Sequence, residues 1–250
     1  MSQISFANIA ITAMATTVGN NIIELEDEKE RFGFDDDSFS RLQRSIGLKT
    51  RYIADEGVCA SDLCVQSAEN IFANTEIIKE EIEALLFVTQ SPDYKAPSTA
   101  IIMQDRLGLP KSCAAFDINL GCSGFIYGLF TAFSYVNSGM KKVLLCVGDV
   151  NSYFSGERDK IFTPLMGDAG SAIIIEKKTR HVAFFHFTAM EADTSISSSQ
   201  RAEQELQARL KHSFQKREKM AESAVMKISL WMAKRCLTLL SKPCLRLSKK

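Results

Sequence analysis

Short apolar runs alternate with amphipathic segments along most of the chain, and this alternation constrains the fold more than any other feature. Apolar runs bounded by polar residues are typical of buried strands. Apolar residues at helical spacing between them predict helices that pack on a sheet. We expect strands at 5–17, 84–89, 114–119, 142–148 and 172–176, and helices at 37–46, 61–73, 100–107 and 125–136. Up to about residue 176, the chain is therefore predicted to be an α/β domain.

Length, charge and cysteine usage exclude several classes of protein. The chain has 250 residues, with 30 Lys and Arg against 30 Asp and Glu, so its formal net charge is zero. This balance argues against a nucleic-acid binder or a polybasic membrane anchor. No apolar run reaches the roughly 18–20 residues that a membrane-spanning helix needs. The seven cysteines are an odd number without paired spacing, which favours a reducing, cytoplasmic location over a disulfide framework.

A cysteine between two glycines is the candidate reactive residue. Cys122 follows the predicted strand 114–119 and precedes the predicted helix 125–136, with Gly121 and Gly124 beside it. A thiol at a helix N-terminus lies near the positive end of the helix dipole, which favours the thiolate. The N–H groups of the first turn can also hold an oxyanion, and glycines let a substrate approach closely. The alternative is an inert buried cysteine, and the local pattern leaves both interpretations open.

Four segments, in order along the chain, carry a resemblance to a known family. The segment around Cys122, Asp-Ile-Asn-Leu-Gly-Cys-Ser-Gly-Phe at 117–125, resembles the nucleophile motif of the β-ketoacyl-ACP synthase III family of thiolase-like condensing enzymes. The other similar segments are Ile-Gly-Leu-Lys-Thr-Arg-Tyr-Ile-Ala at 46–54, Thr-Gln-Ser-Pro-Asp-Tyr-Lys-Ala-Pro-Ser-Thr-Ala at 89–100 and Gly-Asp-Ala-Gly-Ser-Ala at 167–172. The resemblance covers about residues 5–176.

The resemblance implies a fold, a reaction and partners. The fold is the N-terminal half of the duplicated, thiolase-like α-β-α-β-α architecture, a mixed five-stranded sheet with the helix after Cys122 behind it. Cys122 would take an acyl group from acyl-CoA or acyl-ACP as a thioester and condense it with decarboxylated malonyl-ACP, as in fatty-acid or related acyl-chain biosynthesis. The implied partners are acyl carrier protein (ACP) and a second copy of the chain, bound through the strand near Cys122. No permanently bound cofactor or metal is implied.

Three departures from the family pattern qualify these expectations. The family's catalytic His and Asn belong to a second half, and the chain's three histidines lie in no such motif: His181, His186 and His212. An ungapped alignment places Arg41 and Ser45 where the family has an adenine-stacking Trp and a CoA-contacting Arg, which weakens the case for CoA as the acyl carrier. Ala96 stands where the family often has a bulky residue that limits acyl-chain length, so a larger acyl pocket is predicted.

Other residues in these motifs are expected to be structural. Asp117 and Asn119 are interpreted as structural rather than catalytic, and Asp36 or Asp37 as the N-cap of the helix 37–46. Asp168 with its glycine neighbours predicts a tight turn near the site rim or the dimer interface. The remaining cysteines are expected to be ordinary thiols: Cys59, Cys64, Cys113, Cys146, Cys236 and Cys244.

The end of the chain differs in composition from the rest. All 13 glycines lie between residues 19 and 170, and residues 180–250 contain 14 Lys and Arg against six Asp and Glu. Segments 201–219 and 224–240 could be helices, the second basic and amphipathic, but neither continues the earlier alternation. A basic amphipathic helix would ordinarily suggest a membrane surface or a partner helix. A change of reading frame is the interpretation that we favour.

Codons that the sequence forces support a change of frame between residues 176 and 185. Trp231-Met-Ala must be encoded by TGG ATG GCN, and reading two nucleotides later gives GAT GGC, which is Asp-Gly. The same shift over 226–238 permits a segment similar to the family's Met-x-Gly-x-x-Val-Phe-x-Phe. The sequence therefore predicts a thiolase-like domain at 1–178 and an out-of-frame basic tail at 179–250, with the C-terminal half of the fold missing.

Three hypotheses of function follow. The first is an acyltransferase of the synthase III type, and the second is a non-enzymatic remnant that folds poorly or only associates with an intact partner. We favour the first for the family and the second for this polypeptide, because the His and Asn groups are absent. A third reading is an acyltransferase of the same fold that does not decarboxylate its substrate.

Overall fold

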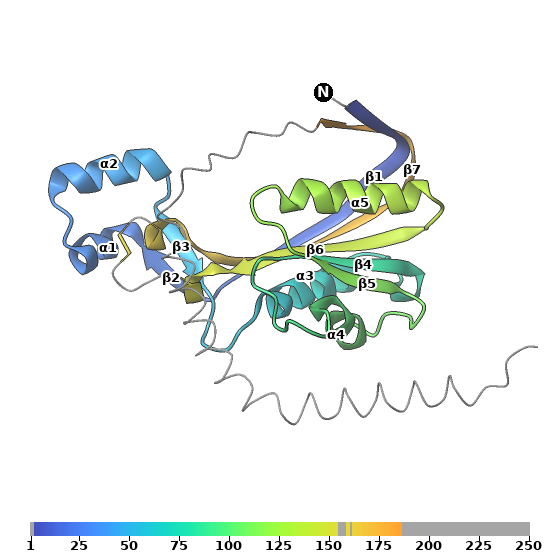
Figure 1. Cartoon of the computed structure of the whole chain (residues 1–250), viewed down its shortest axis with the longest axis horizontal. Coiled ribbons are helices and arrows are strands. Elements are labelled where there is room, and N and C mark those ends of the chain that lie inside the picture. Colours follow the sequence, from blue (N-terminus) through green and yellow to red (C-terminus); the bar gives the residue numbers. More distant parts are fainter. Residues whose placement is uncertain (1–2, 155–158, 161, 187–250) are drawn as a thin grey trace, which may run out of the picture. The chain divides into compact units, whose positions relative to one another are not determined.

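The structure is a computed structural model that describes residues 3–154, 159–160 and 162–186. Within these residues a five-stranded mixed sheet has the strand order β1-β7-β6-β4-β5 (Figure 1). β4, β5 and β6 are parallel, whereas β7 pairs antiparallel with both β6 and β1. The strands are β1 (Gln3–Val18), β4 (Ile82–Val88), β5 (Ala114–Ile118), β6 (Lys142–Val150) and β7 (Asp168–His186). The predicted strands and the mixed five-stranded sheet are confirmed.

Helices cover both faces of the sheet, which explains why the middle residues of its central strands β4 and β6 are apolar. α3 (Ala60–Asn74) and α4 (Thr99–Arg106) lie on one face, and α5 (Gly124–Asn137) lies on the other (Figure 1). Alternate residues of β4 therefore enter two separate cores. Leu85 and Phe87 pack with α3 and α4, whereas Leu86 and Val88 pack with α5. The helices predicted at 61–73, 100–107 and 125–136 are confirmed.

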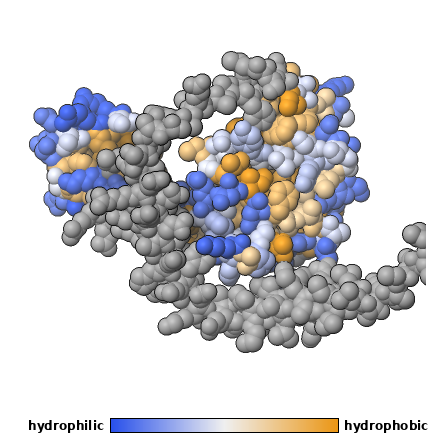
Figure 2. All heavy atoms as spheres, in the orientation of Figure 1, coloured by the Kyte–Doolittle hydropathy of each residue, from blue (hydrophilic) through white to orange (hydrophobic). Residues whose placement is uncertain are grey.

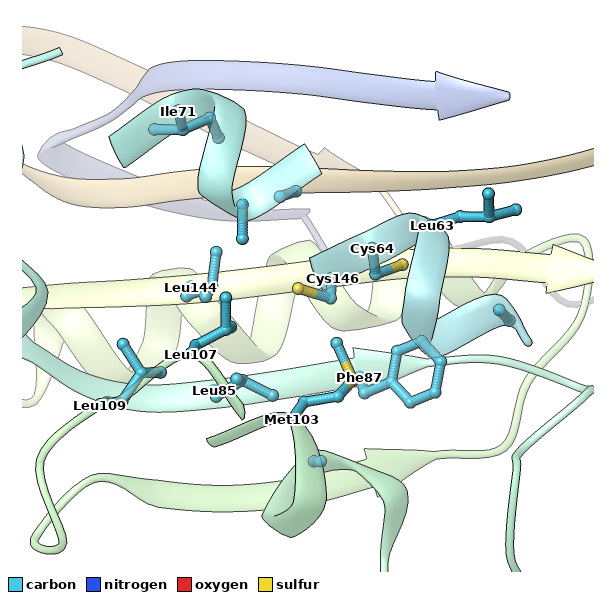
Figure 3. Packing of buried hydrophobic residues seen from close by; sticks show 14 of the residues in the cluster. Leu63, Cys64, Ile71, Leu85, Phe87, Met103, Leu107, Leu109, Leu144 and Cys146 are labelled. Carbon is cyan, nitrogen blue, oxygen red and sulfur yellow. The ribbon is translucent and has the colours of Figure 1, made fainter. Parts of the chain in front are cut away.

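The core on the α3 and α4 face is built from buried apolar side chains and cysteines. Leu85, Met103 and Leu144 are completely buried there, and Cys64 of α3 faces Cys146 of β6 across the cluster (Figure 3). Burial raises the pKa of the Cys64 thiol well above its usual range, and the neighbouring Cys146 thiol adds to this effect. Both thiols are free, as the sequence analysis expected.

A small second sheet has two strands that were not predicted from the sequence, whereas the helix predicted at 37–46 is confirmed between them. β2 (Asn21–Glu24) pairs antiparallel with β3 (Thr50–Ile53), and α1 (Leu25–Phe32) and α2 (Asp36–Ile46) lie between them in the chain. The described residues also form three short 3-10 segments, at Lys79–Glu81, Asn151–Phe154 and Thr163–Leu165. The strands are only four residues long, too short for a clear apolar pattern.

A buried ion pair ties this small sheet to the main one. Glu28 of α1 is 1% exposed, and its carboxylate pairs with the Arg51 guanidinium on β3 at 2.5 Å. Arg51 also donates to the backbone oxygen of Met166, just before β7, at 3.0 Å. Arg51 therefore links α1, β3 and the start of β7, which gives the arginine in the segment 46–54 a structural role.

Two local expectations need correction. The N-cap of α2 is Asp35, whose carboxylate accepts the Ser38 N–H at 2.7 Å, so neither Asp36 nor Asp37 caps the helix. Asp168 lies in no tight turn, because it begins β7 and is 1% exposed. Its carboxylate accepts the N–H groups of Ala54 and Ser152, which fixes two loops against the strand.

The α5 helix is less buried than its composition predicts. Its inner face packs against the sheet through Gly128, Ala132 and Val136. Phe125 and Tyr127 at its beginning remain 38% and 45% exposed. An apolar helix that is buried on one face only has further apolar surface available for another protein layer.

The predicted domain boundary at 178 lies inside β7, which continues to His186 and pairs there with Gln3 of β1. The expected out-of-frame tail, with His212, Cys236 and Cys244, lies outside the described residues from position 187 onward, so its assignment stays a prediction.

Candidate functional site

Cys122 lies in the turn that connects β5 to α5. β5 ends at Ile118, Ser123 is the N-cap residue of α5, and the helix begins at Gly124. The Gly124 N–H donates to the Gly121 oxygen at 2.7 Å, which closes the turn around the cysteine. Cys122 is exposed, in contrast to the buried Cys64 and Cys146. The strand-to-helix position that the sequence predicted is thus present, and the thiol is open to solvent.

The backbone at this position offers hydrogen-bond donors. Among the described residues, no group accepts a hydrogen bond from the N–H of Cys122 or of Ser123. α5 contains 14 residues, so its aligned peptide dipoles add a positive field at the same end. Donors and dipole together can stabilise a thiolate or an oxyanion beside Cys122.

Close packing requires a glycine at Gly124, which meets the buried Val88, whereas the neighbour of Gly121 is the amide end of the exposed Gln90 side chain. A Cβ atom on Gly124 would lie 2.7 Å from the Val88 side chain, and one on Gly121 would lie 2.6 Å from the Gln90 side chain. The turn therefore contacts Val88 at the end of β4 and Gln90 just beyond it. This close approach fixes where the thiol stands at the end of the parallel strands.

A carboxylate organises the loop that contacts Gly121. One oxygen, Asp149 Oδ1 at the end of β6, accepts from Thr89 Oγ1 at 2.9 Å and from the Gln90 N–H at 2.7 Å. It also accepts from the N–H and the hydroxyl of Ser91, both at 3.1 Å. The Ser91 hydroxyl oxygen in turn accepts the Val150 N–H at 3.0 Å. The segment 89–91 is therefore held firmly to β6.

Apolar side chains lie next to the thiol on the surface. Leu120, Phe125, Ile126 and Tyr127 are between 36% and 45% exposed. Orange, apolar side chains reach the surface among polar ones in Figure 2. Further along the same face, a groove of about 610 Å³ lies between α5, β1 and β7 and is lined by residues such as Ile126, Phe133 and Phe185. Such a surface suits an acyl chain or an apolar protein partner.

The other residues singled out from the sequence lie apart from Cys122 or act structurally. Asp117 caps α4, because its two carboxylate oxygens each accept an N–H, from Thr99 and Ala100, at 2.7 Å. Its expected structural role is confirmed. Arg41 and Ser45 are exposed on α2, and Ala96 is exposed in the loop before α4. These three positions thus give no evidence for a nucleotide or acyl pocket.

Histidine does not complete the site within the described residues. The ring of His181 lies on β7 beside the Thr179 oxygen, at 2.9 Å, and His181 lines the groove rather than the Cys122 turn. Asp149 and Gln90 were not identified from the sequence as contributors to the site. The available signal was their place directly after two predicted parallel strands, since the ends of parallel strands meet at one edge of a sheet.

Two kinds of feature are absent from the described residues. No three side chains of His, Cys, Asp and Glu come together as a metal site in the described part of the chain. None of the described helices is long and apolar enough to cross a membrane.

Comparison with known proteins assigns the fold to a family. A sequence model of 3-oxoacyl-[acyl-carrier-protein (ACP)] synthase III matches residues 116–193. A putative 3-oxoacyl-[acyl-carrier-protein] synthase 3 from Campylobacter jejuni is 39% identical over 181 residues, which are 72% of this chain and 51% of that protein. A beta-ketoacyl-[acyl-carrier-protein] synthase III from Koribacter versatilis is 35% identical over 167 residues, which are 66% of this chain and 49% of the relative.

A solved structure agrees with the sequence relatives. The crystal structure of a 3-oxoacyl-(acyl-carrier protein) synthase from Burkholderia xenovorans matches with a TM-score of 0.71 at 29% identity, covering 80% of this chain and 62% of that one. The chain spans about half the length of the curated relatives that it matches. Their sequence likeness, the match across Cys122 and the shared fold show that the chain belongs to the 3-oxoacyl-ACP synthase III family.

Proposed function

We propose that Cys122 is the nucleophile of a 3-oxoacyl-ACP synthase III reaction and accepts an acyl group as a thioester. The observation that supports this most directly is an exposed thiol one residue before the N-cap of α5, in a turn closed by Gly121 and Gly124. The thiol lies at the positive end of the α5 helix dipole, a position that suits chemistry in which negative charge develops. The N–H groups of Cys122 and Ser123 are available to the oxyanion that forms when the acyl carbonyl is attacked.

The proposed reaction has two steps. In the first, the Cys122 thiolate attacks the carbonyl carbon of an acyl-CoA or acyl-ACP thioester, and the carrier leaves as its thiolate. In the second, malonyl-ACP loses CO₂, and the carbanion that results attacks the acyl-cysteine carbonyl. A carbon–carbon bond forms, the Cys122 thiolate leaves, and 3-oxoacyl-ACP is released. Covalent attachment in the first step places the electrophile before the short-lived carbanion appears.

Partners and location follow from the same proposal. ACP is the macromolecular partner, because it carries the malonyl group and the product. β5 is at the edge of the sheet and its five residues are all half-buried, which supports a homodimer formed through the strand next to Cys122. None of the five cysteines in the described residues forms a disulfide, which supports a cytoplasmic location. No permanently bound cofactor or metal is proposed.

We further propose that this chain alone does not complete the condensation. The family places a catalytic His and Asn in a second half, and the histidines of this chain lie outside any such motif. Decarboxylation of malonyl-ACP needs those groups to stabilise the developing negative charge. The chain would then be acylated slowly at Cys122 and stop at that stage.

Acylation is measured by incubating the whole chain with acyl-CoA thioesters of two to twelve carbons and with the corresponding acyl-ACPs. Peptide mass spectrometry is expected to find the acyl group on Cys122 and not in the Cys122→Ala variant. Addition of malonyl-ACP should release no CO₂ above background. Strong preference for acetyl donors would contradict the larger pocket that Ala96 predicts.

Other outcomes would favour the alternative functions. CO₂ release dependent on Cys122 would show that the chain is a complete condensing enzyme. Transfer of the acyl group to a small acceptor without CO₂ release would favour a non-decarboxylating acyltransferase on the same fold. No acylation of Cys122 by any donor, with the chain folded by circular dichroism, would leave the non-enzymatic remnant as the better reading.

A further inference from the structure

The Asp149 carboxylate is placed to act on Cys122 through an intermediate side chain. Asp149 ends β6, and its Oδ1 atom accepts four hydrogen bonds from Thr89, Gln90 and Ser91 at 2.7–3.1 Å. Such a concentration of donors on one oxygen fixes the local backbone, because each bond to a charged acceptor is stronger than a neutral one. Asp149 therefore determines the conformation of the segment that follows β4.

The Gln90 side chain connects this ordered segment to the turn that contains Cys122. The Gln90 side chain is exposed and lies against Gly121, so closely that a Cβ atom there would be 2.6–2.8 Å from three of its amide atoms. Gly121 accepts the Gly124 N–H, the bond that closes the turn around Cys122. A change in the Gln90 backbone would move its amide away from Gly121 and give the turn room to open.

The neighbouring strands support the same connection. The Thr89 N–H donates to the Ile118 oxygen at 3.1 Å, which joins the segment after β4 to the last residue of β5. Ile118 also accepts the Leu120 N–H at 3.1 Å, at the entrance to the cysteine turn. The loop after β4 therefore contacts the turn from both its strand side and its Gly121 side.

We propose that Asp149 is a positioning residue for Cys122, acting by holding Gln90 against Gly121 so that the thiol stays at the N-terminus of α5. This inference rests on the proposed role of Cys122 as the nucleophile. Asp149 contacts neither Cys122 nor any reacting atom, so its effect passes through Gln90. Loss of the contact would let the thiol move away from the N-terminus of α5 and from the positive field there, which would lower its reactivity.

The test measures how fast iodoacetamide alkylates Cys122 in the whole 250-residue chain at pH 7, by mass spectrometry of the Cys122 peptide. This readout needs no acyl donor. Gln90→Ala and Asp149→Ala are each expected to slow Cys122 alkylation about threefold or more, as loss of a helix-terminus interaction predicts. The double variant should react at the rate of Asp149→Ala, because residues that act through one contact give non-additive effects.

Glu83→Ala is the matched control. Glu83 also uses a carboxylate to hold a loop, since it accepts the Lys141 N–H at 2.6 Å, but it lies at the opposite end of β4. Removal of the Glu83 carboxylate should leave the alkylation rate of Cys122 unchanged. In urea that unfolds the chain, Cys122 should be alkylated at the same rate in all variants. Gln90 is exposed, so Gln90→Ala keeps the test valid should Asp149→Ala fail to fold.

Three results would overturn the proposal. They are a wild-type rate in Gln90→Ala, a double variant whose slowing is the product of the two single effects, and a Glu83→Ala rate as low as that of Asp149→Ala. Failure of the proposed function gives a different pattern. In that case acyl donors do not modify Cys122, while replacement of Asp149 or Gln90 still slows its alkylation by iodoacetamide.

Discussion

Replacement of Gly170 by alanine tests how tightly β7 packs on α3. A Cβ atom on Gly170 would lie 2.5 Å from the Cys64 nitrogen and 2.7 Å from the carbonyl carbon and the Cβ of Leu63. These distances are 0.7–0.9 Å short of the 3.4 Å at which ordinary contact begins. The obstacle is mostly helix backbone, which cannot rotate aside as a flexible side chain can, so the strand and helix must separate.

The expected cost is at the upper end of the range for overpacking, about 3 kcal/mol of the free energy of unfolding. With a urea dependence of about 2 kcal/mol per M, the unfolding midpoint should fall by about 1.5 M. Circular dichroism in urea measures this shift. Separation of β7 from α3 would also expose Cys64, which should then react with a thiol reagent faster than in the wild type.

Gly167→Ala is the control, three residues earlier in the same motif. A Cβ atom on Gly167 would lie 3.3 Å from the backbone oxygen of Tyr52, a contact that a small adjustment relieves. The expected loss of stability is less than about 1 kcal/mol, because such a position nearly accommodates a methyl group. A Gly170→Ala midpoint equal to wild type, or an equal loss in both variants, would refute the close approach of β7 to α3 as the reason for glycine.

Three further predictions concern charge, pH and the exposed face of α5. Glu28→Ala should cost about 3–5 kcal/mol in urea unfolding, because Arg51 is left buried and unpaired; a loss below about 1 kcal/mol would contradict this. Burial raises the pKa of Cys113 to about 11 from 9.0. The stability that this thiol contributes is therefore complete below pH 9 and declines as pH rises through 11. Cys113→Ala should make the decline less steep when the urea midpoint of unfolding is measured from pH 8.5 to 11. The chain should self-associate in sedimentation, and Ile126→Lys, at a side chain that is 43% exposed, should reduce this association without lowering stability; a monodisperse wild-type monomer would argue against the apolar face as a contact surface.

The main sheet could be predicted from the sequence because its signals are local and strong. β4 and β6 are short apolar runs between polar residues, and Gly108 and Pro110 mark the end of α4. The glycines at 121 and 124 predicted that Cys122 lies in a strand-to-helix turn. These features need no knowledge of distant residues, since periodicity and turn residues report directly on burial and backbone conformation.

Features that depend on pairing of distant residues could not be predicted. Glu28 and Arg51 are 23 positions apart, and each looks like an ordinary surface charge until β2 and β3 pair. Gln90 reaches Gly121, and Asp149 reaches Gln90, only because three parallel strands end together. The glycines at 167–170 were interpreted as a turn, since the sequence shows small residues without showing the helix that presses on them.

The pairing and packing of β7 indicate where the part of the sequence that is typical of the family ends. Its pairing with β1 shifts register between Lys177 and Val182, in the interval where the change of reading frame is predicted. Beyond that shift, Phe185 is 6% exposed and its ring lies 5.4–5.6 Å from those of Phe6, Phe130 and Phe133.

An aromatic residue that fits three others is not expected of an out-of-frame sequence, because random residues rarely complete a packed cluster. The packing of Phe185 therefore favours a change of frame after codon 185, and the family match that continues to residue 193 points the same way. Resequencing the coding DNA from codon 176 onward decides this. An inserted or deleted nucleotide found before codon 182 would show that the burial of Phe185 is accidental.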